Sequence, residues 1–242
     1  MNRRAYHPVI APLIPSGSFP VIATDIPIMY EDEGQEKLGE TLPHSTSIQI
    51  LTLGLRSHFA PRPVFHVISN MNVHYSRLDR KAYISPDVMV VNPPRPLPKS
   101  LRSYRIGKNK PAPLVTIEVL SRRSFQQQDL SNKPEILSEL GIREYLLVDV
   151  TSEFLPTHLE RRELQANGSW VSGQDPDGGI TSELGFRIVM EDDGQLRVLE
   201  RATGRKYLRP DEAEDARSQA EQRIRELEDE LERLRAKARK RK

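Results

Sequence analysis

The chain is organised around one apolar stretch, Pro113-Leu114-Val115-Thr116-Ile117-Glu118-Val119-Leu120-Ser121. A continuous β-branched and aliphatic run of this length, bounded by Pro and Ser, predicts a strand that is buried on both faces of a sheet. Glu118 lies at the centre of that run, where an uncompensated carboxylate would cost several kcal/mol. The sequence therefore predicts that another group compensates the charge of Glu118.

A second stretch has the same unusual feature. In Ser85-Pro86-Asp87-Val88-Met89-Val90-Val91 an acid opens an apolar strand, directly after a proline with a fixed backbone angle. Two close carboxylates repel each other unless a cation lies between them. If the two strands are neighbours, Asp87 and Glu118 predict a divalent-metal site. Residue type alone leaves an alternative open, in which Asp87 is only a turn or strand-start residue.

The composition limits the kind of site that the chain can build. With 242 residues, 37% of them hydrophobic, it can form one substantial core with an appendage. It has no cysteine, which excludes disulfides, thiolate zinc sites and cysteine nucleophiles. A site must therefore use oxygen and nitrogen atoms. The net charge of +2 does not by itself indicate a polyanionic partner.

No segment indicates a membrane span or an export signal. No apolar run approaches the roughly 20 residues that cross a bilayer. Residues 1–20 also lack the apolar core of a signal peptide. The absence of cysteine gives no sign of an oxidising compartment. We therefore expect a cytoplasmic protein without membrane association.

The rest of the chain alternates between helical and strand patterns. Apolar residues at helical spacing predict a first helix that ends before Pro61. The alternation over residues 64–75 predicts one long strand or two short ones, and residues 92–113 read as a long polar loop. Pro134 and Gly141 bound a second helix, and residues 144–150 follow as another buried strand. This order predicts an α/β fold.

From residue 211 the composition changes to Ala, Glu, Arg and Leu. Apolar residues then recur at alternating spacings of four and three: Ala220, Ile224, Leu227, Leu231, Leu234 and Ala238. This spacing is typical of a coiled-coil seam, although a solvated capping helix is the alternative. We expect residues 1–210 to form one domain with an N-terminal arm and C-terminal β excursions, and residues 211–242 a charged helix that joins a homodimer.

The order and spacing of four motifs identify a family resemblance. The motifs are Pro86-Asp87, Ile117-Glu118-Val119-Leu120-Ser121, Asp129 with Lys133, and Gly141-Ile142-Arg143-Glu144-Tyr145-Leu146-Leu147-Val148-Asp149. Together they resemble the Uma-two family of putative restriction endonucleases, in the PD-(D/E)XK nuclease superfamily. The resemblance covers roughly residues 42–149. It implies a restriction-endonuclease-like core, with a mixed β-sheet flanked by helices, and a C-terminal helix.

The resemblance also implies roles for individual residues. Asp87 and Glu118 would hold Mg²⁺ or Mn²⁺, and the backbone carbonyl of Val119 would complete the ligand set. The usual superfamily lysine, two residues after the second acid, is absent because that position is Leu120. Lys133 would take over its role by orienting the attacking water. Asp87, Glu118 and Lys133 are then the catalytic residues.

Two further residues are accessory candidates. His44 matches a position often occupied by histidine in the family, where it would either contact the metal region or make a loop hydrogen bond. Asp129 would lie near the second helix. It also offers an alternative for Lys133, which by residue type alone pairs with Asp129 as a solvated lysine.

The function implied by the resemblance is that of a metal-dependent endonuclease acting on DNA. Arg122 and Arg123, together with the basic stretch 102–110, are candidates for phosphate contacts. The alternative is a nuclease-derived, catalytically weak module that binds nucleic acid or regulates another protein. The leucine at position 120 favours that alternative slightly.

Overall fold

The computed structural model describes residues 41–76, 79, 81–121 and 132–239. The predicted N-terminal arm lies outside this part of the chain. The helices are α1 (Leu42–Phe59), α2 (Lys133–Glu139) and α3 (Pro210–Arg239). The strands are β1 (His66–Ser69), β2 (Val73–His74), β3 (Tyr83–Ile84), β4 (Val88–Val91), β5 (Tyr104–Arg105), β6 (Val115–Val119), β7 (Glu144–Val148), β8 (Leu159–Leu164), β9 (Trp170–Gly173), β10 (Ile180–Thr181), β11 (Phe186–Met190) and β12 (Leu196–Glu200).

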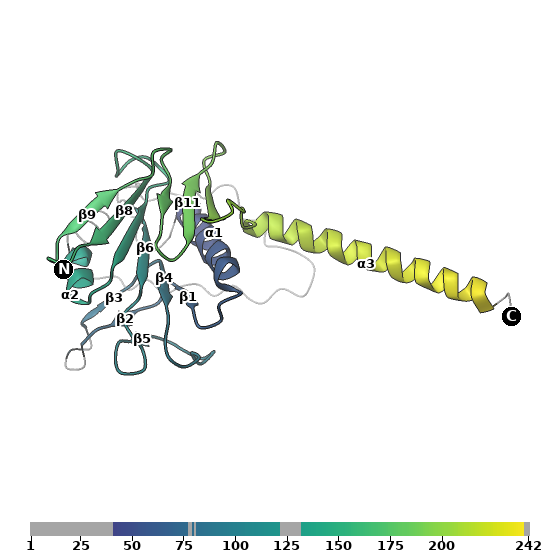
Figure 1. Ribbon diagram of the computed structural model, residues 1–242, viewed down its shortest axis with the longest axis horizontal. Coiled ribbons are helices and arrows are strands. Elements are labelled where there is room, and N and C mark those ends of the chain that lie inside the picture. Colours follow the sequence, from purple (N-terminus) through teal and green to yellow (C-terminus); the bar gives the residue numbers. More distant parts are fainter. Residues whose placement is uncertain (1–40, 77–78, 80, 122–131, 240–242) are drawn as a thin grey trace, which may run out of the picture. The chain divides into compact units, whose positions relative to one another are not determined.

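A six-stranded sheet forms the centre of the fold, in the order β1-β4-β6-β7-β8-β9 (Figure 1). Its two middle strands, β6 and β7, run parallel and are joined through α2, whereas the other neighbouring pairs are antiparallel. The sheet is therefore mixed and flanked by helices, which confirms the predicted α/β fold class. The run around Glu118 forms β6, and every one of its five residues is buried.

The side chains of the central strands alternate between two apolar layers. One layer contains Val88, Val90, Ile117, Leu146 and Val148 and is covered by Ile48, Leu51 and Leu55 of α1 and by Phe186, Ile188, Leu196 and Val198 of a second sheet. That sheet has the order β10-β11-β12. The opposite layer contains Met89, Val91, Tyr145 and Leu147 and is covered by Leu137 of α2 and by Val73, Ile84 and Tyr104 of a third sheet. The third sheet has the order β3-β2-β5.

Close packing holds α1 in its layer. Gly54 faces Val198 of β12, and a Cβ at residue 54 would lie only 2.7 Å from the Val198 Cβ. Non-bonded carbon atoms do not approach so closely, so glycine is required for α1 to lie against β12. Leu51 and Leu55 are fully buried on the same helix. Truncating either to Ala would cost about 2–5 kcal/mol, because a cavity would remain.

The third sheet corrects one expectation. Residues 92–113 were predicted as a long loop, but the structure places β5 within them, paired in parallel with β2. The strand has only two residues, Tyr104 and Arg105, so it has no periodic pattern of its own. The alternating run 64–75 forms two strands in different sheets, β1 and β2.

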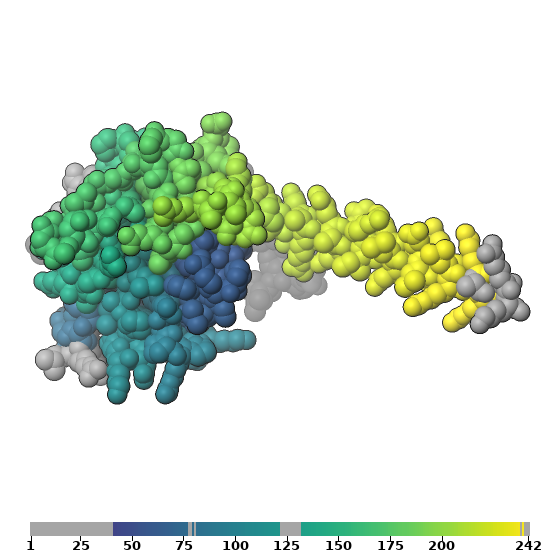
Figure 2. Space-filling view, viewed as in Figure 1, coloured from purple at the N-terminus to yellow at the C-terminus, as the bar shows by residue number. Residues whose placement is uncertain are grey.

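The C-terminal helix begins with an ionic anchor between Glu212 and the buried Arg197. Glu212 accepts hydrogen bonds from Arg197 Nη2 at 2.7 Å and from the Arg209 amide at 2.8 Å. The Arg197 guanidinium lowers the pKa of the Glu212 carboxyl to about 2. Beyond this anchor the described side chains of α3 are exposed, and Figure 2 shows them in yellow. No helix in the described residues is long and apolar enough to cross a bilayer.

Candidate active site

The two predicted acids lie on neighbouring strands. Strand β4 pairs with β6 in antiparallel register, with Val88 opposite Ile117, so the next position places Asp87 opposite Glu118. Residues opposite each other on antiparallel strands share a sheet face, with Cβ atoms about 4.5–5.5 Å apart. For Asp87 and Glu118 this is the face that α2 covers. The register therefore brings together two acids that are 31 positions apart in the sequence.

Two neighbours contact the Asp87 carboxylate, and a third bonds its backbone. The Val119 amide donates a hydrogen bond to Asp87 Oδ2 at 2.8 Å, and His44 Nε2 lies 3.5 Å from the same oxygen. The backbone carbonyl of Asp87 also accepts a hydrogen bond from the Asn70 amide at 3.0 Å. The side chain of Asp87 remains 17% exposed, so it is accessible to a ligand. These contacts fix the direction of the carboxylate.

Glu118 has a cation as its partner. Lys133 Nζ lies 2.8 Å from Glu118 Oε2, and the two side chains are only 12% and 3% exposed. A pair this buried interacts more strongly than a surface pair, but its desolvation is also costly. Lys133 is therefore the group that compensates the charge of Glu118. The alternative pairing with Asp129 involves a residue outside the described part of the chain.

The start of α2 places Lys133 beside Glu118. Lys133 is the first residue of the helix and is followed by Pro134, whose fixed φ suits a first turn. The Trp170 indole nitrogen donates a hydrogen bond to the Pro134 carbonyl at 3.0 Å, which ties this turn to β9. Gly141 adopts a φ of +68° just past the helix end, as predicted. The helix is thus fixed at both ends.

The donor set fits a hard divalent cation. Mg²⁺ prefers carboxylate and carbonyl oxygens and retains several water ligands, so two protein carboxylates are sufficient. Among the residues that the structure describes, no group of three or more His, Asp and Glu side chains could hold a metal. Asp87 and Glu118 are the candidate ligands that the sequence predicts, with the Val119 carbonyl as a further predicted oxygen.

An open groove adjoins Lys133. Its volume is about 670 Å³, and it is lined by Lys81, Tyr83, Ile84, Ser85, Asn132, Lys133 and Ile136. The groove lies between β3 and the first turn of α2. Lys133 therefore faces both Glu118 and a space that can admit a ligand.

The sequence interpretation did not single out a second buried glutamate. Glu144 opens β7 and is 2% exposed, and it accepts hydrogen bonds from Ser182 Oγ at 2.5 Å and from the Glu183 amide at 3.0 Å. Arg161 Nη1 lies 3.4 Å from Glu144 Oε1, the oxygen that also accepts from the Glu183 amide. Burial raises the pKa of the Glu144 carboxyl. The acid at the start of an apolar run was a visible signal, the same one that indicated Asp87.

Asp149 is a structural residue. Its carboxylate accepts hydrogen bonds from the amides of Thr151, Phe154 and Leu155 at 2.6–3.1 Å and is fully buried. Burial alone would raise the pKa of this carboxyl, but the amide donors outweigh it and lower the pKa. Asp149 thus ends β7 and organises the loop that follows it.

Of the remaining residues predicted for the site, some lie in the described part of the chain and others do not. Arg122, Arg123 and Asp129 lie outside the described residues. The basic stretch 102–110 forms β5 and the turn closed by the Gly107–Lys110 bridge. His44 lies in the first turn of α1 and contacts Asp87.

Comparisons with known proteins yield a family match and a structural likeness. The model of the Uma2 family, described as putative restriction endonuclease, matches residues 32–186. Among solved structures, one similar chain is a putative nuclease belonging to DUF820 from Anabaena variabilis ATCC 29413. It is 17% identical, the match covers 62% of this chain and 79% of that chain, and the TM-score is 0.45. No curated protein matches the sequence.

Proposed function

Because the chain belongs to the Uma2 family of putative restriction endonucleases, we propose that it is a metal-dependent endonuclease that hydrolyses phosphodiester bonds in DNA. The observation that carries this proposal is the cross-strand pair of Asp87 and Glu118, with Lys133 Nζ 2.8 Å from the buried glutamate. Two neighbouring acids and a lysine that lines a groove suit hydrolysis of a phosphate ester. In this proposal Lys133 takes the role of the lysine that the superfamily usually has at the position of Leu120.

Asp87 and Glu118 would hold Mg²⁺ or Mn²⁺. The bound cation would lower the pKa of a water molecule and stabilise the charge that develops on the phosphate. Asp87 contributes an oxygen whose direction is set by the Val119 amide and by His44. Glu118 contributes an oxygen in a buried strand that cannot easily move. His44 is a positioning residue, because it acts through Asp87.

Lys133 would act on the reacting atoms. Its ammonium group is held against Glu118 by the ion pair and by the first turn of α2. From there it can orient the attacking water and place positive charge beside the phosphate. An ammonium has three donors, so Lys133 can keep its bond to Glu118 while it donates to a ligand in the groove.

We propose DNA as the substrate because the family is described as putative restriction endonuclease and because basic residues gather locally in the sequence. The basic stretch 102–110, together with Arg122 and Arg123, would contact phosphates without reading a sequence. Affinity for DNA should then fall steeply with salt. We place this activity in the cytoplasm, which agrees with a chain that has no cysteine.

We further propose that the protein acts as a homodimer through α3. Ile224, Leu227, Leu231 and Leu234 form one stripe of the helix and are 48–55% exposed. A second copy of the stripe would remove this apolar surface from water. Removing the residues after Pro210 should therefore lower the molar mass of the particle measured by light scattering to that of a single protomer.

Nicking of supercoiled plasmid DNA tests the catalytic proposal. The wild-type protein should convert supercoiled DNA to the open-circular form in Mg²⁺ or Mn²⁺ but not in EDTA. Catalysis by the purified Glu144→Gln variant should persist, because Glu144 lies on the opposite face of the sheet. DNA binding without nicking in either cation would show instead that the chain is a nuclease-derived binding module.

A further inference from the structure

The third sheet presents a row of polar and aromatic side chains on its outer face. His74 of β2 pairs with Tyr83 of β3 and with Arg105 of β5, so the three residues lie side by side across the sheet. Their neighbours Val73, Ile84 and Tyr104 point the other way and are buried in the core. We call Tyr83, His74 and Arg105 the outer row.

The outer row combines aromatic surface with positive charge. The His74 and Tyr83 rings lie 5.4 Å apart, tilted by 50°. Tyr83 is 46% exposed, more than any other Phe, Tyr or Trp side chain in the described residues. Arg105 is exposed at the other end of the row, and Lys81 precedes Tyr83 by two residues. Proteins that bind single strands use this combination, because rings stack on bases and cations contact phosphates.

The outer row leads to the proposed active site. Lys81, Tyr83 and Ser85 line the same groove as Lys133. Because β3 is an edge strand of its sheet, its side of the groove has no further strand beyond it. A nucleic-acid strand whose phosphate reaches Lys133 would therefore run past Tyr83.

We propose that the outer row binds an unpaired segment of the nucleic-acid substrate, with one base stacked on Tyr83 and a phosphate beside Arg105. This proposal rests on the proposed nuclease function and names the form of its substrate. Bases inside a duplex are stacked on each other and cannot stack on a tyrosine ring. The preferred substrate would thus have a single-stranded region next to the bond that is cut.

Binding to two oligonucleotides in EDTA separates this proposal from catalysis. One is single-stranded oligodeoxythymidine, and the other is an abasic strand of the same length with the same phosphates but no bases. Tyr83→Ala should weaken binding of oligodeoxythymidine roughly 10- to 100-fold and leave abasic binding unchanged, because only stacking is lost. Tyr83→Phe retains the ring and should bind like the wild type.

Two arginine variants serve as controls for charge. Arg105→Ala should weaken binding of both strands and reduce the slope of the salt dependence by about one. Arg201 is an exposed arginine in the turn after β12, on the side of the opposite apolar layer. Arg201→Ala should change neither the affinity for the two strands nor the slope of the salt dependence. The proposal is overturned if Tyr83→Ala binds oligodeoxythymidine as the wild type does, or if the wild type does not prefer it over the abasic strand. Either result leaves metal-dependent nicking untouched.

An independent observation concerns the orientation of the proposed dimer. In the heptad of α3, Ile224 and Leu231 take position a, and Leu227 and Leu234 take position d. Within parallel coiled coils, Ile at a with Leu at d, as at Ile224 and Leu227, favours two strands over three or four. The apolar stripe is thus compatible with a parallel dimer.

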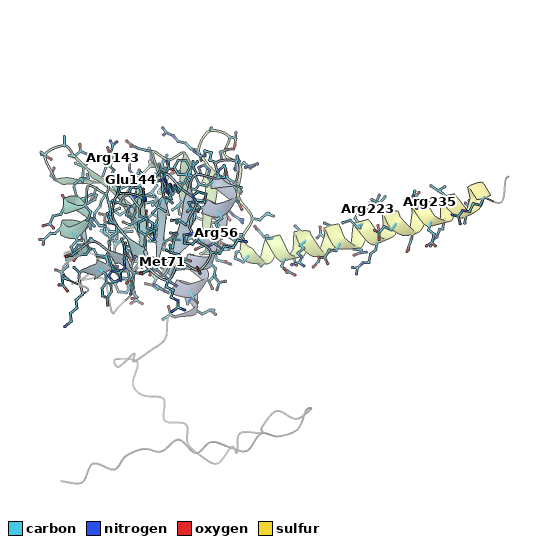
Figure 3. All side chains as sticks on the ribbon, turned by 90° about the horizontal axis from the view of Figure 1, so that it is seen from below. Arg56, Met71, Arg143, Glu144, Arg223 and Arg235 are labelled. Atoms are coloured by element: carbon cyan, nitrogen blue, oxygen red, sulfur yellow. The ribbon has the colours of Figure 1, made fainter. Side chains whose placement is uncertain are left out.

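The charges beside the stripe favour the parallel orientation. Arg223 and Glu230 occupy position g, and Glu228 and Arg235 occupy position e; Arg223 and Arg235 are labelled in Figure 3. In a parallel dimer each g residue faces the next e residue of the second copy. Arg223 then meets Glu228, and Glu230 meets Arg235. Both contacts join opposite charges.

An antiparallel dimer would join mostly like charges instead. If Ile224 faced Leu234 of the second copy, Glu230 would meet Glu230, and Arg223 would meet Lys237. At position e, Glu228 would meet Glu228, and only Glu221 with Arg235 would join opposite charges. The structure describes intrahelical pairs on the same surface, such as Arg223 with Glu226 at 3.1 Å. Exposed pairs of this kind contribute little and are easily exchanged. They do not oppose the parallel pairing.

We infer that α3 joins two copies of the chain as a parallel, in-register coiled coil. This rests on the proposed homodimer and specifies its geometry. Because Glu212 ties the start of α3 to the domain, both domains would lie at the same end of a helix of about 45 Å. Two active sites would then lie at the same end of the dimer.

Single cysteines in the full-length chain test the orientation, since the natural chain contains none. Leu227→Cys should form a disulfide-linked dimer on mild oxidation, because residue 227 meets its own copy only in the parallel register. Asp229→Cys, on the outer surface of the coiled coil, should remain unlinked. In the antiparallel register, linking would require a mixture of Leu227→Cys and Leu231→Cys.

Charge reversal gives a second measurement without changing the seam. Arg235→Glu should raise the dimer dissociation constant, and adding Glu230→Arg should restore it by recreating opposite pairs. The inference is overturned if Leu227→Cys links only in the mixture, or if the second substitution fails to restore the dimer. A wild-type protein that is monomeric by light scattering would instead contradict the homodimer itself.

Discussion

Two buried glutamates on neighbouring central strands have opposite surroundings. Glu118 on β6 and Glu144 on β7 are each 2% exposed, but they point to different faces of the sheet (Glu144 is labelled in Figure 3). Glu144 is bonded by a hydroxyl, an amide and Arg161. Glu118 contacts Lys133, with Asp87 opposite it across the ladder.

On the proposed function, this difference separates a metal-binding acid from a structural one. Burial is the same in both cases, so burial alone does not indicate function. The donors to Glu144 come from the segment after β10 and from β8, and they link the central sheet to the second sheet. Glu118 has a second acid opposite it, and its lysine lines a groove. A repelling neighbour and access to solvent are therefore the features that indicate a metal site.

The largest expected effect comes from Glu118→Gln. Removing a metal ligand should lower the plasmid-nicking rate by about 10³-fold or more, because the metal contributes several kcal/mol to the transition state. Glu144→Gln should nick within about threefold of the wild-type rate, which is less than 1 kcal/mol. Rates are compared for folded variants at equal concentration in Mg²⁺. Equal losses in both variants would mean that the two glutamates do not differ in role.

The next effect should come from Lys133→Ala. This change removes the cation that faces both Glu118 and the groove, and nicking should fall by about 10²-fold, the scale of one positioned catalytic group. Metal binding should persist, because both carboxylates remain. Nicking rates and Mn²⁺ binding are measured on the same preparation. If Lys133→Ala nicks like the wild type, the lysine is only a structural partner of Glu118.

Stability should respond in the opposite order to activity. Glu144→Ala leaves the Ser182 hydroxyl and the Glu183 amide without their acceptor, so the free energy of unfolding should fall by about 2 kcal/mol. Glu118→Gln keeps an oxygen that can accept from Lys133 and should cost about 1 kcal/mol. Urea denaturation of the metal-free variants measures both. A larger loss for Glu118→Gln would reverse the comparison.

The smallest effect is a pH dependence at Glu144. Burial raises the pKa of this carboxyl above its ordinary value of 4.5, so the folded state favours the protonated form. The stability that this group contributes is present below pH 4.5 and is lost as the pH rises through the folded-state pKa. Glu144→Gln cannot titrate. Its stability relative to the wild type should therefore rise as the pH increases from about 4.5 through the raised pKa of Glu144.

That pH dependence is checked by urea denaturation of both proteins at several pH values. A stability difference that does not change with pH would mean that the folded-state pKa of Glu144 equals the unfolded one. A change of the opposite sign would mean that Arg161 dominates over burial.

Local signals in the sequence were sufficient for the centre of the fold. Strands β4 and β6 follow continuous apolar runs, and α2 lies between Pro134 and Gly141 as predicted. Proline and glycine act on the backbone at their own positions, so these boundaries can be read without a structure. The adjacency of Asp87 and Glu118 was implied by the family resemblance, because two apolar runs do not by themselves show that their strands are neighbours.

Non-local pairing explains what the sequence could not supply. Strand β5 has two residues, and its partner β2 lies about 30 positions earlier, so no local pattern reveals it. The outer row of Tyr83, His74 and Arg105 exists only through that pairing. The partners of Glu144 are likewise distant, since Ser182 directly follows β10 of another sheet. Sequence alone could not show which of two buried glutamates is structural.

Calorimetric titration of Mn²⁺ into metal-free protein tests the difference between the two glutamates most directly. We expect the wild type and Glu144→Gln to bind Mn²⁺ with the same stoichiometry and similar affinity, and Glu118→Gln and Asp87→Asn to show no saturable binding. Each variant is checked by circular dichroism, so that a loss of heat cannot come from unfolding. Saturable binding by a folded Glu118→Gln protein, or none by the wild type, would contradict a metal site at Asp87 and Glu118.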